Sequence, residues 1–118
     1  MAVRDLSALQ KKLLEFARLR DWEQFHAPKN LVMALSVEAS ELLEHFQWLS
    51  ETQSKQLDAE KKHAVSLEMA DIFIYLMRLA TELEVDILAA VDEKIKINNE
   101  KYPADKVRGS SKKYNEYD

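Results

Sequence analysis

The chain has 118 residues, of which 47% are hydrophobic and 32% charged, with one glycine, two prolines and no cysteine. This composition excludes collagen-like, low-complexity and disordered chains, and the scarcity of turn residues favours long helices. A formal net charge of −4 gives no overall attraction for polyanions, which argues against a nucleic-acid partner. We therefore expect a single all-α domain.

No segment has the pattern of a secretory signal or a membrane span. The N-terminus lacks the basic and then apolar stretch of a signal peptide. The longest apolar run, residues 69–77, is interrupted by Asp71 and falls far short of the roughly 20 residues that cross a bilayer. The sequence predicts a cytoplasmic protein with no membrane partner.

The first predicted helix runs from Ser7 to about Arg20. Ser7 and Gln10 fit a capping box, and apolar residues follow at helical spacing. An aromatic break comes next, in which Pro28 prevents a continuous helix. Asn30 is placed to cap the second helix.

Three further helices are predicted downstream. The second spans residues 31–49 and carries one apolar stripe. The third is capped by Asp58 and runs to about Leu83, and the fourth is capped by Asp86 and ends before Pro103. Four helices with short connections predict a four-helix bundle.

The predicted bundle occupies residues 1–104, and residues 105–118 form a basic, flexible C-terminal tail. The central part of the third helix is apolar on almost every side, so it must be buried all round. One short chain offers too few helices to cover it, and soluble monomers rarely expose such a surface. We therefore expect a homo-oligomer.

Two acidic pairs with the same spacing lie on the second and third predicted helices. Glu68 and Asp71 share a narrow arc with Tyr75, and Glu38 and Glu41 are also three residues apart. If these helices pack side by side, four carboxylates converge, which is costly because like charges and burial both oppose ionisation. An all-oxygen set suits Mg²⁺ or Mn²⁺ better than Zn²⁺. The alternative is that the acids of the second helix are ordinary solvated residues.

Five segments, in this order and spacing, resemble the MazG-like all-α nucleoside triphosphate pyrophosphohydrolases, in the branch that contains the dCTP pyrophosphatases. They are RDWEQFHAPKNL (20–31), EASELLEHFQW (38–48), EMADIFIYL (68–76), KIKINNEKYP (94–103) and SSKKY (110–114). The resemblance implies hydrolysis between the α and β phosphates, giving a monophosphate and pyrophosphate. It also implies Mg²⁺ held by Glu38, Glu41, Glu68 and Asp71. Family members assemble as homodimers or as dimers of dimers, and of these two we expect the tetramer.

The resemblance also places a set of aromatic and imidazole side chains around the base and sugar, and aromatic faces suit a flat heterocycle. This set comprises Trp22, Phe25, His26, Trp48 and Tyr75. For the two tryptophans and Phe25 the alternative is core packing, and for His26 it is a loop-stabilising role. The chain has Leu13 where some close members carry histidine.

Further residues are placed to act on the triphosphate. Glu44, one turn beyond Glu41, is a candidate to orient or deprotonate the attacking water. Lys94 and Asn98, at i and i+4, present a cation and an amide from one helix face, unless they form a solvated surface pair. The tail adds three cations, Arg108, Lys112 and Lys113.

Two other functions compete with hydrolysis of a nucleotide. A di-iron or di-manganese carboxylate bundle needs two E-x-x-H motifs, and this chain has one, Glu60 to His63. A non-catalytic helical oligomerisation or binding module would leave the acids solvated and indifferent to metal.

Overall fold

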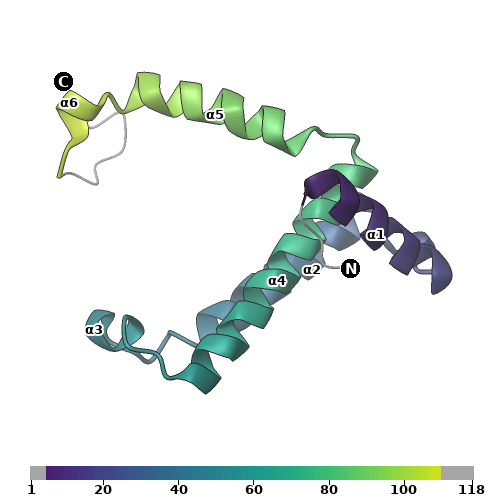
Figure 1. Cartoon of the computed structure of the whole chain (residues 1–118), viewed down its shortest axis with the longest axis horizontal. Helices are drawn as coiled ribbons and strands as arrows, with labels where there is room; N and C mark the ends of the chain where they lie inside the picture. Colours follow the sequence, from purple (N-terminus) through teal and green to yellow (C-terminus); the bar gives the residue numbers. More distant parts are fainter. Residues whose placement is uncertain (1–4, 110–118) are drawn as a thin grey trace. The chain divides into compact units, whose positions relative to one another are not determined.

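The computed structural model describes residues 5–109, and all regular secondary structure in this range is helical (Figure 1). The prediction of an all-α protein is confirmed. In chain order the elements are α1 (Leu6–Leu19), the 3-10 turn η1 (Glu23–Phe25), α2 (Pro28–Glu44), α3 (Glu51–Ser54), α4 (Ala59–Glu82), α5 (Ile87–Lys101) and α6 (Ala104–Val107). Within the described range, none of these helices has the length and apolar character that crossing a bilayer requires.

Helices α4 and α5 begin where their capping residues predicted. The Asp58 carboxylate accepts the backbone N–H of Lys61 at 2.8 Å, at the start of α4. The Asp86 carboxylate accepts that of Ala89 at 3.1 Å, at the start of α5. Each bond satisfies one backbone donor that the first helical turn leaves without a partner, so the local sequence is enough to place these two starts.

Two other predicted caps were wrong. Helix α1 is capped by Asp5, whose carboxylate accepts the N–H of Ala8 at 2.7 Å, and Ser7 lies inside the helix. Helix α2 begins at Pro28, which suits the first helical position because its missing N–H has no partner there in any case. Asn30 therefore lies within α2, and its side chain donates to the carbonyl of Phe25 at 3.1 Å.

Helix α2 also ends earlier than predicted. It stops at Glu44, a turn follows, and Ser50 with Gln53 forms a reciprocal capping box that opens the short α3. The short helix α6 begins at Ala104 and extends into the predicted C-terminal tail, while residues 110–118 of that tail lie outside the described range.

The chain divides into two compact units, Met1–Glu84 and Val85–Asp118. In the first unit α4 packs along α2, and α1 packs against α4 (Figure 1). A hydrogen bond of 3.1 Å from Gln10 to Thr81 links α1 to α4. The buried apolar residues of this unit are Ala17, Leu31, Val65, Met77 and Ala80. Helices α5 and α6 make up the described part of the second unit, and the inclusion of α5 in one bundle with the others stays a prediction.

Helix α4 is not buried on every side within the described chain, as expected if one chain offers too few helices to cover it, and its burial by another subunit stays a prediction. Leu67, Met69 and Phe73 keep 55%, 57% and 37% of their surface exposed. Met69 and Phe73 are four residues apart and share one face. At about 100° per residue, Phe73 points about 140° away from Glu68, so this apolar face lies opposite the acidic one.

Candidate functional site

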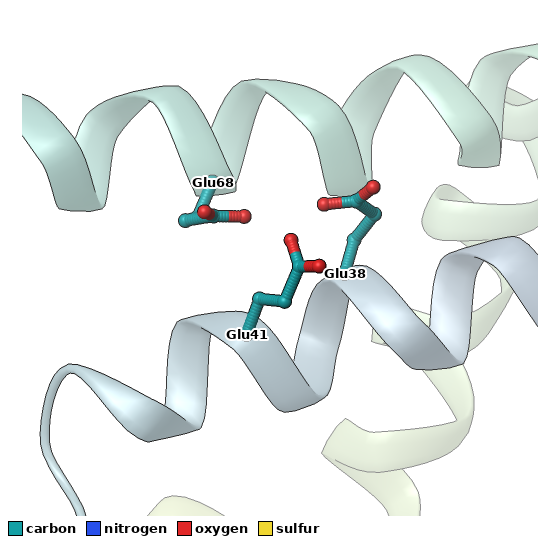
Figure 2. A group of neighbouring side chains, drawn as sticks. All are labelled: Glu38, Glu41 and Glu68. Atoms are coloured by element: carbon teal, nitrogen blue, oxygen red, sulfur yellow. The ribbon is translucent and has the colours of Figure 1, made fainter.

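Three carboxylates meet between α2 and α4. Glu38 and Glu41 project from α2 and Glu68 from α4, and their side chains point toward one another (Figure 2). One oxygen of each lies within 4.8 Å of one oxygen of the other two. We call these three residues the acidic cluster. Within residues 5–109 they are the group of acidic, histidine or cysteine residues whose ligand atoms converge in this way.

Burial and mutual repulsion make full ionisation of the acidic cluster unfavourable. Burial raises the pKa of Glu38 to about 7, and its interactions with Glu41, Asp71 and Glu68 add to that rise. One oxygen each of Glu38 and Glu68 is buried with no hydrogen-bond partner in the described chain. Buried polar atoms without partners are rare in folded proteins, and here they indicate a place for a cation or a proton.

The metal-free protein should become less stable as the pH rises from about 4.5 to about 7. The pKa of Glu38 in the folded chain, about 7, lies above its ordinary value of 4.5. The folded state therefore holds a proton that the unfolded state has released, and this stabilisation disappears as the pH passes 7. Glu38→Gln, which is neutral at every pH, should melt at a higher temperature than the wild type near pH 8 and at a similar one near pH 4.

Thermal unfolding in the presence of a chelator measures this difference, with Glu51→Gln as the control because Glu51 is exposed, lies on another helix, α3, and is outside the cluster. Equal losses of stability in the wild type and Glu38→Gln between pH 5 and pH 8 would contradict the raised pKa of Glu38 and the crowding of the acids.

Asp71 lies one turn beyond Glu68 and is exposed, outside the three-residue cluster. Its charge nevertheless acts on Glu38. Asp71 also lines a cavity of about 250 Å³ formed by α1, the segment after it, and α4. The other residues that line the cavity are Leu13, Phe16, Ala17, Trp22, His26, Ile74, Tyr75 and Arg78. Asp71 therefore interacts with the acidic cluster and also forms part of the cavity wall.

The end of α1 forms one wall of the cavity. Asp21, two residues after the last residue of α1, adopts a left-handed conformation with φ of 54°. This reversal lets the N–H of Trp22 donate to the carbonyl of Ala17 at 2.9 Å. The Trp22 ring then meets Phe16 edge-on, with ring centroids 5.7 Å apart. An aromatic wall is thus built by local turn geometry.

The other wall contains a buried arginine. Arg78 is 2% exposed, and its Nη2 lies 2.7 Å from a carboxylate oxygen of Glu82. Its Nε and Nη2 lie 3.4 and 3.3 Å from Nδ1 of His26. Burial and then the charge of Arg78 lower the pKa of His26, against the opposing charges of Glu82 and Glu23. His26 is therefore neutral near pH 7, which suits Nδ1 to accept a hydrogen bond from Arg78.

The structure brings together some of the predicted site residues and not others. Trp22, His26 and Tyr75 line the cavity. Phe25 and Trp48 do not, and they are 61% and 87% exposed.

The remaining predicted residues are all on the surface or outside the described range. Glu44 is exposed as the last residue of α2, and Lys94 and Asn98 are exposed on α5 in the second unit. Arg108 is exposed after α6. Glu60 and His63 are exposed and do not belong to the acidic cluster, while Lys112 and Lys113 lie outside the described residues.

Sequence reasoning missed Arg78, which is the charged residue buried most deeply in the described chain. The spacing of residues along α4 could have identified it. Arg78 follows Asp71 by seven residues, which is two helical turns to within about 20°. It therefore shares the face of α4 that carries Asp71 and Tyr75.

Several known proteins are similar to this chain in sequence or in structure. Over 113 residues the chain is 42% identical to human dCTP pyrophosphatase 1, and over 111 residues it is 41% identical to the mouse protein. These alignments cover 94% and 92% of the chain but 66% and 65% of the relatives, so the chain spans just under two thirds of their length. The crystal structure of a pyrophosphatase from Archaeoglobus fulgidus superposes with a TM-score of 0.80 at 36% identity, covering 87% of this chain and 96% of that one. Residues 33–117 match the MazG-like family. The chain belongs to the MazG-like family.

Proposed function

We propose that this chain is a Mg²⁺-dependent nucleoside triphosphate pyrophosphohydrolase that converts dCTP or a related deoxynucleotide to the monophosphate and pyrophosphate. The observation that carries the proposal is the convergence of Glu38, Glu41 and Glu68 beside a partly aromatic cavity. The names of the relatives, dCTP pyrophosphatase 1 and a pyrophosphatase, support the same chemistry.

The donor set fits a hard divalent cation. All the converging ligand atoms are carboxylate oxygens, and two of the oxygens in the cluster are buried without a partner. Asp71, one turn beyond Glu68, is the fourth proposed ligand. Mg²⁺ prefers such oxygen ligands, and Mn²⁺ is the expected substitute. The bound ion would neutralise phosphate oxygens and polarise a water molecule.

The chain's own residues then position the reactants. Glu44 lies one turn beyond Glu41 at the end of α2, where it is proposed to orient or deprotonate the attacking water. Trp22 and Tyr75 hold the base in the cavity by contact with their rings. Lys94 and Asn98 supply a cation and an amide to the phosphates. Phe25 and Trp48 stay predicted base contacts, although neither lines the cavity in the described chain.

Assembly as a homo-oligomer, specifically a dimer of dimers, is part of the proposal. Its support is the apolar face of α4 formed by Met69 and Phe73, which is exposed and lies opposite the acidic cluster. A second subunit covering this face would remove apolar surface from water without blocking the metal ligands.

A panel of ribo- and deoxyribonucleoside triphosphates, incubated with Mg²⁺ and separated by chromatography, tests the reaction class. We expect equal amounts of monophosphate and pyrophosphate, with dCTP among the best substrates. Release of inorganic phosphate and a nucleoside diphosphate would contradict the proposal. A protein that neither hydrolyses any triphosphate nor binds Mg²⁺ in calorimetry would instead be a non-catalytic helical module.

The bond that is attacked gives a separate prediction. The chain has no cysteine, and the proposed site contains no serine nucleophile, so water should attack the phosphate directly. In ¹⁸O-labelled water, mass spectrometry should find one labelled oxygen in the monophosphate, because attack occurs at the α phosphorus. Label confined to pyrophosphate would place the attack at the β phosphorus.

A further inference from the structure

Arg78 lines the cavity and has a buried hydrogen-bonding group that the proposed reaction leaves unexplained. The residue is 2% exposed and lines the cavity, and its Nη1 is buried with no partner in the described chain. A buried guanidinium nitrogen whose N–H groups lack an acceptor destabilises the folded protein, because the lost hydration is not replaced. The unpaired atom therefore indicates an acceptor that arrives with a ligand.

The rest of the Arg78 side chain is held in place. Nη2 is bound by Glu82 at 2.7 Å, and Nε and Nη2 lie within 3.4 Å of Nδ1 of His26. Only Nη1 remains, with two N–H groups. Because the guanidinium is planar and its other corners are fixed, Nη1 has a defined position before any ligand enters. Such preorganisation is typical of a recognition group.

The position of Arg78 along α4 matches the base end of a nucleotide. Asp71, Tyr75 and Arg78 share one helix face, and seven residues from Asp71 to Arg78 advance about 10 Å along the axis. A nucleotide whose phosphates lie at the acids would run along this face, past the Tyr75 ring, and bring its base toward Arg78. Because of this separation from the acids, Arg78 is placed to contact the base and not the phosphates.

We propose that Arg78 determines base specificity by donating from Nη1 to a carbonyl oxygen of the nucleobase, such as O2 of cytosine. The proposal rests on the proposed function, which puts a nucleotide in this site. Adenine has no carbonyl, so an adenine nucleotide would leave Nη1 unpaired and bind more weakly. Sites built to bond a particular group discriminate strongly against ligands that lack it, because the buried donor is then left unsatisfied.

Equilibrium binding of dCMP and dAMP with Mg²⁺, measured by calorimetry, tests the proposal. The wild type should bind dCMP about 10- to 100-fold more tightly than dAMP. Arg78→Met keeps the length of the side chain but has no donor, so it should weaken dCMP by that factor and change dAMP less than about threefold. Arg18→Met is the matched control, since Arg18 is an exposed arginine on α1, paired with Glu23 at 3.2 Å and outside the cavity, and it should leave both constants unchanged.

A ligand-side variant covers the case in which Arg78→Met does not fold, which circular dichroism would reveal. In 2-thio-dCMP the O2 carbonyl is replaced by sulfur, a weaker acceptor, and the wild type should bind it at least about fivefold more weakly than dCMP. Failure of the wild type to hydrolyse any triphosphate would refute the proposed function while the monophosphate binding ratios still judge Arg78. Equal losses for dCMP and dAMP in Arg78→Met, no preference in the wild type, or no dCMP binding at all would overturn the proposal.

Discussion

Glu68→Ala should reduce Mg²⁺-dependent hydrolysis by at least about 100-fold, because replacing even a residue behind the metal ligands costs 10- to 100-fold in metal affinity or activity. Glu68 projects from α4 toward two carboxylates of α2, and one of its oxygens is buried without a partner (Figure 2). Its removal takes away the ligand that α4 contributes to the cluster. Steady-state kinetics at saturating Mg²⁺ and calorimetric titration with Mg²⁺ alone measure the two expected losses.

Asp71→Ala should show the same pattern, because Mg²⁺ tolerates departures from its oxygen ligand set poorly. Glu60→Ala is the matched control, since Glu60 is an exposed acid in the first turn of the same helix and lies outside the cluster. It should bind Mg²⁺ and hydrolyse substrate as the wild type does. Activity of Glu68→Ala within threefold of the wild type would remove Glu68 from the metal site.

Phe73→Glu should dissociate the assembly and lower activity without altering a metal ligand. Phe73 lies on the exposed apolar face of α4 and points about 140° away from Glu68. A charge placed at this contact would have to be buried without a partner, which is strongly unfavourable. Light scattering should give the wild type a mass that is a multiple of 13.7 kDa and give the variant a smaller one. Leu76→Glu, one turn farther along the same face, should behave in the same way.

Leu19→Glu provides the control for the added charge. Leu19 is 84% exposed at the end of α1, so a glutamate there should remain solvated and leave the mass unchanged. An active wild-type protein with a mass near 13.7 kDa at micromolar concentration would contradict assembly. The apolar face of α4 would then have to be covered within the chain.

The sequence by itself determined the features that depend on short-range geometry. The starts of α4 and α5 followed from Asp58 and Asp86, because a capping carboxylate bonds to a backbone N–H three residues away. The pairing of Glu38 with Glu41 followed from helical spacing in the same way. The start of α1 was misplaced by two residues, since Asp5 and Ser7 are both good caps and sequence alone does not rank them.

Only the tertiary structure decided which side chains meet and which are buried. Packing of α2 along α4 brings Glu68 into the cluster and leaves Asp71 at the cavity, although the two share one arc of the same helix. Arg78 interrupts an apolar helix in the sequence, and its burial against His26 follows from the packing of the segment after α1 on α4. Burial and long-range hydrogen bonds depend on contacts between segments far apart in the chain, here 52 residues from His26 to Arg78, and no local pattern encodes them.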